Sequence, residues 1–419
     1  MTTLLKSAKI IDAASPFHNT TKDILIVDGI ITEINDTIPA KEEYTTVNLE
    51  NLHVSNGWFD TSVCFGEPGF EERENIENGI QVAAKSGFTK VAVNPNTNPI
   101  VDHKSAVEFL ISKAKESPVD LYPIGALTQK SVGIEMAELF DMKQSGAIAF
   151  GDYNKPIEND NLLKIALLYA QNFDGLVLSF PKNKKIAGEG VAHEGINATK
   201  LGLKGIPALA EEIQIARDLF LLEYTGGKLH IPTISTAKSV ELIKEAKAKG
   251  LQVTCSVAVH NLLLTDEKLF GFEANVKVTP PLRTQTDVDA LINGVKEGII
   301  DIITSDHNPI DIEDKKVEFS IAKNGTIGLE SAFGALNTIL DIDTIIACMS
   351  HNPKSIFSIP NTSITIDSQA NLTLFSPEGE YIFEENSILS TSKNSIFIGE
   401  KMKGKAYGIY ADQQLILNI

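Results

Sequence analysis

Cysteine is scarce in this chain of 419 residues: Cys64, Cys255 and Cys348 are the only three, and they are far apart. So few scattered cysteines exclude a disulfide framework of the kind found in small secreted domains. No uninterrupted run of about eighteen apolar residues is present to span a bilayer, and the amino terminus has no pattern of a secretory signal. We therefore expect a cytoplasmic protein that does not associate with membranes.

Positive charge is also in short supply. The chain has 37 lysines and arginines against 55 aspartates and glutamates, a formal net charge of −18. No basic cluster stands out, so binding to nucleic acid or to an anionic membrane by charge is not expected. Hydrophobic residues make up 43% and charged residues 22% of the chain, which is ordinary for a globular protein with a large core.

Both ends of the chain favour β-structure. Strand-like runs at 23–27 and 30–34 flank Asp28-Gly29, a pair typical of a tight hairpin because both residues tolerate positive φ. Residues 370–375 and 395–398 are also strand-like. We expect residues 1–54 and 361–419 to form a small β-sandwich lobe together.

The middle of the chain, residues 55–360, alternates between short apolar runs and longer stretches with helical spacing, such as 206–224 and 237–249. Strand–helix alternation repeated about eight times predicts an α/β fold, a (β/α)8 TIM-type barrel. Active sites in such barrels lie where the strands end. The residues at the predicted strand ends are therefore the candidates for function.

The first predicted barrel strand ends in an unusual segment, residues 60–69. Ser62 and Cys64 are two residues apart, so they point to the same face of a strand. A metal-dependent hydrolase would carry a His-x-His pair there, and Gly66 stands where an arginine could grip substrate. Cys64 can be either a small buried hydrophobic residue or a soft metal ligand.

The other strand ends offer few donors. Asn96 lies in an Asn-Pro turn that backbone geometry alone could explain, and Asp152 is the only carboxylate after the fourth strand. Of the eight histidines, His230, His260 and His307 fall near strand ends. A single histidine in such a place can be a hydrogen-bonded structural residue or a ligand, and the sequence leaves both interpretations open for His307, which neighbours Asp306.

The ordered motifs of the chain resemble dihydroorotases, members of the amidohydrolase superfamily, over nearly its whole length. This resemblance implies a barrel of the amidohydrolase kind and a place in pyrimidine biosynthesis. The matching segments are 57–60 with 67–69, 94–97, 194–195, 201–207 with 210–212, 229–231 with 235–237, 262–266, 280–283, 306–307 and 328–330.

The departures from the family pattern fall on functional positions. The resemblance implies that four zinc-binding histidines are replaced here, by Ser62, Cys64, Ser179 and Thr233. It also implies that a substrate-binding arginine is replaced by Gly66 and a substrate-binding asparagine by Thr279. The family's general acid/base remains as Asp306. Three further residues are expected as remnants of the substrate pocket: Asn96, Asp152 and His307.

Zinc is central to the chemistry that the resemblance implies, because it lowers the pKa of bound water from about 15.7 to about 7. Neutral hydroxyls are poor zinc ligands, and one thiolate cannot hold a catalytic zinc alone. We therefore expect no family-type zinc site and no other cofactor, and we expect Asp306 to be a vestigial general acid/base. A carboxylate base alone contributes only about 10²–10⁴-fold.

Three functions follow as hypotheses. The first is a catalytically silent dihydroorotase homologue, an oligomer that serves as a scaffold or partner for aspartate carbamoyltransferase, as some metal-less family members do. The second is an active metal-dependent cyclic amidohydrolase, interconverting carbamoyl-aspartate and dihydroorotate or acting on another substrate, whose zinc would be held by an altered set such as Cys64, Asp152 and Asp306 with one histidine. The third is a dihydroorotase with a metal-free route.

Overall fold

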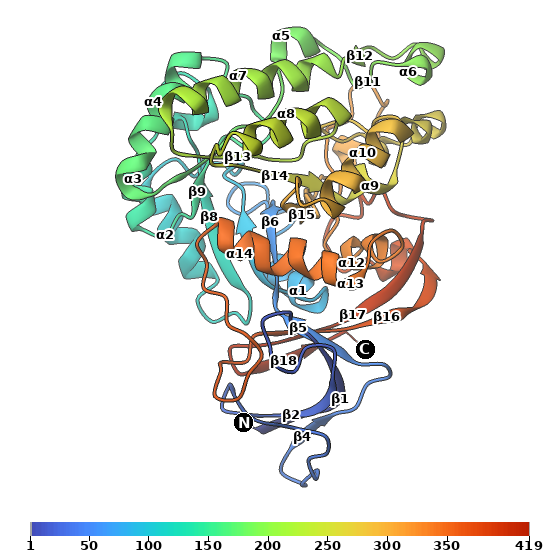
Figure 1. Ribbon diagram of the computed structural model, residues 1–419. Helices are drawn as coiled ribbons and strands as arrows, with labels where there is room; N and C mark the ends of the chain where they lie inside the picture. The colour runs from blue at the N-terminus through green and yellow to red at the C-terminus, as the bar shows by residue number, and fades with distance from the viewer. Residues whose placement is uncertain (1, 419) are drawn as a thin grey trace.

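Eight parallel strands form the larger part of the computed structural model, which describes residues 2–418 (Figure 1). They run in chain order around the sheet, each hydrogen-bonded to the next. The last strand returns to the first, where Cys64 N donates to the carbonyl of His307 at 2.7 Å. The (β/α)8 barrel is thereby confirmed. Its strands are β6 (Trp58–Val63), β7 (Phe88–Val93), β8 (Asp120–Gly125), β9 (Ala149–Phe150), β10 (Leu176–Leu178), β13 (Lys228–Ile231), β14 (Val253–Ala258) and β15 (Ile302–Thr304).

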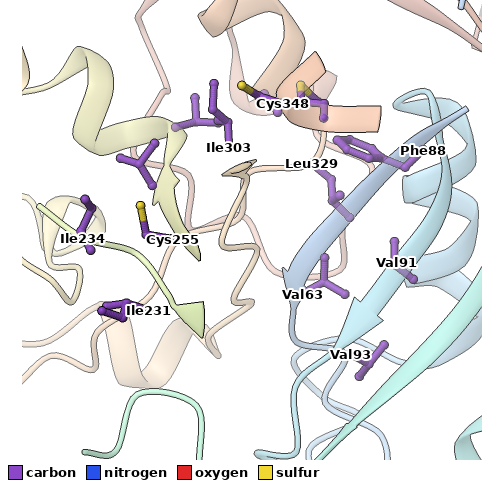
Figure 2. Packing of buried hydrophobic residues seen from close by; sticks show 14 of the residues in the cluster. Val63, Phe88, Val91, Val93, Ile231, Ile234, Cys255, Ile303, Leu329 and Cys348 are labelled. Atoms are coloured by element: carbon purple, nitrogen blue, oxygen red, sulfur yellow. The ribbon is translucent and has the colours of Figure 1, made fainter. Parts of the chain in front are cut away.

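Residues along each barrel strand alternate between the interior and the helix-covered outer side, as a period of two requires. On β10, Leu176 and Leu178 belong to a core inside the barrel, whereas Val177 packs with the outer core. Figure 2 shows part of that outer core, in which Val63, Val91 and Val93 extend from β6 and β7. This alternation decides which strand-end side chains can face a site at the barrel mouth.

Helices cover the outside of the barrel (Figure 1). The predicted helices at 206–224 and 237–249 are confirmed as α7 (Leu209–Thr225) and α8 (Ala237–Ala248). The Thr236 side chain caps α8 by accepting from Ser239 N, a typical helix start. No helix in residues 2–418 has the length and apolar character needed to cross a membrane. The other helices are α1 (Ile76–Lys85), α2 (Lys104–Lys113), α3 (Leu139–Gln144), α4 (Asp160–Ala170), α5 (Lys184–Ala187), α6 (Ile196–Leu201), α9 (Val259–Leu263), α10 (Gln285–Lys296), α11 (Ile312–Lys315), α12 (Ala332–Leu336), α13 (Ile342–Ile346) and α14 (Asn352–Ile356).

The two chain ends form a strand-rich lobe with a core of its own. The predicted hairpin is confirmed, with Asp28 at φ 47° and Gly29 at φ 83° in the turn. The lobe boundary predicted at residue 54 falls inside β5, which pairs with the lobe strands β1 and β16. The lobe strands are β1 (Thr2–Ile11), β2 (Thr21–Val27), β3 (Ile30–Asn35), β4 (Thr45–Val47), β5 (His53–Asn56), β16 (Leu372–Ile382), β17 (Lys401–Ala411) and β18 (Gln414–Leu417), and a separate pair, β11 (Ala192–His193) and β12 (Gly205–Ile206), lies beside the barrel.

One strand prediction near the carboxyl terminus is wrong. Residues 395–398 lie in a turn and not in a strand. Ile396 and Phe397 are buried in the outer core of the barrel, and Ile396 N donates to the Thr326 hydroxyl at 2.9 Å. The apolar run therefore reflects burial against the barrel and not pairing within a sheet.

Asp60 joins the first barrel strand to the last. Its carboxylate is buried and accepts hydrogen bonds from Ser62 N at 3.0 Å, Ser305 N at 2.8 Å and the Thr304 hydroxyl. The bridge that closes the barrel joins Val63 to His307, beyond the end of β15. The Asp60 side chain therefore adds a link from β6 to the end of β15 itself.

Asp60→Ala should lower the free energy of unfolding by about 2–4 kcal/mol, because three buried donors would lose their acceptor. Urea unfolding followed by circular dichroism measures the change. The matched control is Glu241→Ala on α8, which removes an exposed carboxylate paired with exposed Lys238 and should cost less than about 1 kcal/mol. Equal losses in the two variants would contradict this role of Asp60.

Candidate functional site

Four side chains from four strand ends meet at the barrel mouth. The Ser62 hydroxyl donates to Asp306 Oδ1 at 2.9 Å, and Asn94 Nδ2 donates to Ser62 Oγ at 3.0 Å. The Tyr153 hydroxyl donates to the same Asp306 oxygen at 3.3 Å. We call these four residues the Asp306 network. They follow or end β6, β7, β9 and β15, which is why a parallel barrel brings them together.

The cavity beside the network is very small, with a volume of about 20 Å³. That is room for about one water molecule, whereas sites for drug-sized ligands are usually about 300–1,000 Å³. The cavity is lined by Thr61, Ser62, Asn94, Ile124, Tyr153, Asn154, Leu178, Phe180, His230, Pro232, Thr233, Ser256, Asp306 and Phe357.

Burial raises the pKa of Asp306 from its ordinary value of 3.8 to about 7, because no cation offsets the cost of its charge. The negative charge of nearby Asp60 raises it further, while the hydroxyls of Ser62 and Tyr153 lower it. Asp306 therefore keeps its proton at acidic pH. The residues that contact it carry hydroxyl groups and no positive charge.

Cys64 lies behind this network. It is buried, and Asn94 Nδ2 approaches its Sγ at 3.7 Å. Burial raises the pKa of the Cys64 thiol to about 12, so in the absence of a bound metal ion the group carries its proton at neutral pH. Asn96, one of the predicted pocket remnants, is half-buried beside the same thiol and does not line the cavity.

Asp152 and His307 turn away from the cavity. The Asp152 carboxylate accepts hydrogen bonds from Thr128 N at 3.0 Å and from the Thr128 hydroxyl. These bonds connect Asp152 to the loop that contains Thr128. His307 Nδ1 accepts from Gly328 N at 3.2 Å, and its ring packs edge-on against Phe65. Neither residue lines the cavity, so both predicted pocket remnants have structural contacts instead.

Two positions differ from the alignment implied by the resemblance. Ser179 does not line the cavity; its hydroxyl donates to buried Asp218 at 2.6 Å on the outer side. The next residue, Phe180, faces the cavity instead. Likewise the fourth strand presents Tyr153, and not Asp152, to the mouth. The cavity-facing positions of these strands are therefore aromatic.

His230, Asn94 and Tyr153 were not predicted as site residues. His230 lines the cavity, but its ring is within hydrogen-bond distance of the Thr254 hydroxyl at 2.9 Å and the Ser256 hydroxyl at 3.2 Å. Burial lowers the pKa of His230 to about 3, so the ring is neutral. Side chains alternate between the two faces of a strand, and the neighbours of His230 on β13, Leu229 and Ile231, belong to the outer core. This alternation could have placed His230 inside the barrel.

The backbone at the mouth is left-handed at three residues: Tyr153 (φ 53°), Thr233 (φ 49°) and Asp306 (φ 49°). Aspartate and histidine are enriched in this conformation, but bulky and β-branched residues are rare there. Tyr153 and Thr233 therefore sit in a conformation that costs about 1–3 kcal/mol each. At position 233, the histidine that the resemblance implies would suit this backbone better than threonine.

Gly66 cannot carry a side chain in this structure. A Cβ at residue 66 would lie 2.0 Å from the Phe70 carbonyl oxygen and 3.0 Å from that of Glu74. These are backbone atoms of the loop after β6, so they cannot move aside as a flexible side chain could. The path of this loop therefore leaves no room for an arginine at residue 66, where the resemblance implies one.

The donors at the mouth do not fit zinc. Within residues 2–418, no group of three or more histidine, cysteine, aspartate or glutamate side chains is placed to hold a metal ion. Around Asp306 stand two hydroxyls and an amide, and the nearby Cys64 supplies a single sulfur. Zinc prefers imidazole, thiolate and carboxylate ligands.

The fold is an eight-stranded parallel barrel with a strand-rich lobe, shared with hydantoinase structures. The L-hydantoinase (dihydropyrimidinase) from Arthrobacter aurescens superposes with a TM-score of 0.86 at 20% identity, covering 99% of this chain and 96% of that one. A D-hydantoinase structure superposes with a TM-score of 0.84 at 21% identity, covering 100% of this chain and 95% of that one. At this identity the likeness shows the fold alone.

Sequence comparison identifies the family. Residues 53–239 match the dihydro-orotase-like family model. A dihydroorotase of Geotalea daltonii is 37% identical over 99% of both chains, and one of Ruminiclostridium cellulolyticum is 40% identical over 97% of this chain and 96% of its own. The chain belongs to the dihydroorotase family, as the motifs indicated.

Asp306→Asn should stabilise the protein more at pH 8 than at pH 5. The folded state keeps a proton on Asp306 up to about pH 7, whereas the unfolded chain releases it near pH 3.8. Stability therefore falls as the pH rises through this window, by up to about 4 kcal/mol. The uncharged amide avoids this loss, and urea unfolding at both pH values measures it. Asp36→Asn, at an exposed carboxylate, is the control. An unchanged pH dependence in Asp306→Asn would contradict the buried acid.

Proposed function

We propose that this chain is a catalytically silent member of the dihydroorotase family that acts through binding another protein. The observation that carries the proposal is the Asp306 network. Its Tyr153 and Ser62 hydroxyls bond to the one carboxylate that faces the cavity, and Phe180 faces the same small cavity.

Hydrolysis or closure of a cyclic amide near neutral pH requires an activated nucleophile and stabilisation of the carbonyl oxygen. The mouth offers neither. Its histidine, His230, lies beside two hydroxyls and is uncharged, and its thiol is protonated. The path of the loop at Gly66 leaves no room for a side chain at the position where an arginine could bind a substrate carboxylate.

We infer that the partner is aspartate carbamoyltransferase, in the cytoplasm. The pyrimidine pathway of the family supports this choice, because an inactive homologue can still assemble with the neighbouring enzyme of the same pathway. The intact barrel supports it as well, since a scaffold needs its outer surface and not its mouth.

Two measurements on the full-length protein test the proposal. The purified chain should show no turnover of dihydroorotate or carbamoyl-aspartate, with or without added zinc. It should also bind the carbamoyltransferase of its own cell at micromolar concentration in analytical ultracentrifugation. Turnover that Asp306→Asn abolishes would overturn the silent assignment, and failure to bind would overturn the partner.

Zinc ligands installed at the mouth should give metal binding only if Tyr153 and Phe180, which face the cavity, are among the residues replaced. We expect the variant Ser62→His, Cys64→His, Tyr153→Asp, Phe180→His and Thr233→His to bind about one zinc per chain, because an imidazole–carboxylate set would surround Asp306. Metal analysis of the dialysed protein measures it.

Two controls use the same background. One retains Tyr153, whose hydroxyl would keep its bond to Asp306, and the other carries Ser179→His in place of Phe180→His, on the side facing Asp218. Both should bind clearly less zinc. Equal zinc in all three variants would contradict the assignment of Tyr153 and Phe180 as the cavity-facing positions.

One observation favours the second candidate, an active amidohydrolase. A carboxyl group with a pKa of about 7 is well matched to general acid–base catalysis near neutral pH, and Asp306 has such a pKa. In that case activity towards a cyclic amide would fall by about 10²–10⁴-fold in Asp306→Asn. A chelator distinguishes a metal-dependent route, which it would abolish, from a metal-free route, which it would leave intact.

A further inference from the structure

One loop beside the barrel mouth exposes two branched aliphatic side chains. Val132 is 58% and Ile134 is 71% exposed, and Gly133 between them has nothing within 4 Å of the place where a Cβ would lie. We call residues 128–136, which lie between β8 and α3, the rim loop. None of its residues lines the cavity at the mouth, so its tip, residues 132–134, belongs to the outer surface of the protein.

Exposed aliphatic residues occur on most proteins, and the backbone beneath this pair is what sets it apart. Lys130 (φ 55°) and Ser131 (φ 50°) are two successive residues with left-handed angles, in which residues other than glycine are uncommon. The Ser131 side chain is buried, and within residues 2–418 its hydroxyl has no hydrogen-bond partner. Strain of this kind persists only where the surrounding structure imposes it, and it is concentrated at functional segments.

Two carboxylates outside the rim loop impose this conformation. Buried Asp152 accepts hydrogen bonds from Thr128 N at 3.0 Å and from the Thr128 hydroxyl, and that hydroxyl in turn accepts from Gly133 N at 2.9 Å. Asp102, in the loop after β7, accepts from Lys130 N at 2.7 Å. The start of the loop, its strained turn and its tip are therefore all connected to groups on neighbouring parts of the barrel.

A tip held in this way is preorganised for contact with another protein. Ordering a mobile loop on binding costs conformational entropy, and a loop that is already ordered avoids most of that cost. A connection that served only to join β8 to α3 would need neither two left-handed residues nor an uncovered aliphatic pair. The arrangement is that of a small apolar knob on a fixed support.

The charges around the tip indicate which kind of partner fits it. The chain has a net charge of −18, so nucleic acid and anionic membrane surfaces would be repelled. Lys130 and Glu135, on the two sides of the tip, are exposed, and their side chains have no ion-pair partner within residues 2–418. A folded protein that presents an apolar pocket with one carboxylate and one cation at its rim would match the tip and both charges.

We propose that the tip of the rim loop is the part of this chain that enters the carbamoyltransferase, with Val132 and Ile134 in an apolar pocket of that enzyme and with Lys130 and Glu135 pairing with charges at the pocket rim. The inference rests on the proposed function and names the surface through which it operates. Asp152 is then a positioning residue, because it lies behind the loop and keeps the tip in its docking orientation.

Binding of the full-length chain to the carbamoyltransferase of its own cell, measured by analytical ultracentrifugation, tests the proposal. Val132→Asp with Ile134→Asp should weaken the complex at least ~100-fold, because an apolar pocket does not accept charged side chains. The matched control is Ile196→Asp, at an aliphatic residue of α6 that is 74% exposed, and it should bind as the wild type does. All three positions are exposed, so the fold should be retained, which circular dichroism checks.

The outcomes separate this proposal from the proposed function. A double variant that binds as tightly as the wild type overturns the role of the rim loop while the proposed function stands. Equal weakening in Ile196→Asp also overturns that role, since the effect would not be specific to the loop. A wild type that does not bind overturns the partner and the rim-loop proposal together.

Asp152→Ala tests the positioning role. Loss of the carboxylate frees Thr128, so amide hydrogen exchange at residues 129–134 should quicken, and the affinity should fall at least ~10-fold because the tip must then be ordered on binding. Asp152→Asn, whose amide can accept from Thr128 N and donate to the Thr128 hydroxyl, should retain the exchange rates and the affinity of the wild type. Faster exchange with unchanged affinity in Asp152→Ala would show a structural role alone and would overturn the preorganised tip.

Discussion

The state of the barrel mouth depends on one buried carboxyl group without a cation. Asp306 is enclosed where eight strands converge, and its bonded neighbours are hydroxyls. A charged carboxylate in such a place is costly, so the group keeps its proton up to about pH 7. Tyr153 and Ser62 complete its hydrogen bonds, and within residues 2–418 no cluster of three metal-ligating side chains lies beside it.

The backbone of the barrel mouth does not suit all of the side chains that it carries. Tyr153 and Thr233 hold left-handed backbone angles that their own side chains disfavour. At Gly66, by contrast, the loop has closed to the point that no Cβ fits. The backbone of the mouth is thus poorly matched to the side chains at Tyr153 and Thr233, whereas at residue 66 it has room for glycine alone.

The sequence predicted much of the fold because the relevant signals are local. The Asp28-Gly29 hairpin and helices α7 and α8 follow from turn chemistry and apolar periodicity. The strand predicted at 395–398 was wrong because an apolar run shows burial but not what covers it. Cytoplasmic location, oligomer formation and the carbamoyltransferase partner stay predictions.

The site was harder to predict than the fold. Ser62, Thr233 and Asp306 lie at the cavity, yet Asp152 and Ser179 point away from it while their neighbours Tyr153 and Phe180 point in. A shift of one residue at a strand end reverses the direction of a side chain, and neither motif fixes that register. The left-handed backbone at Tyr153 is likewise set by tertiary contacts that a single sequence does not reveal.

Calorimetric titration of zinc into chelator-treated wild-type protein, paired with the same titration of Asp306→Asn, tests the central claim most directly. The account predicts that the two titrations are the same, with no heat that depends on Asp306. Saturable binding of one zinc per chain that disappears in Asp306→Asn would contradict it.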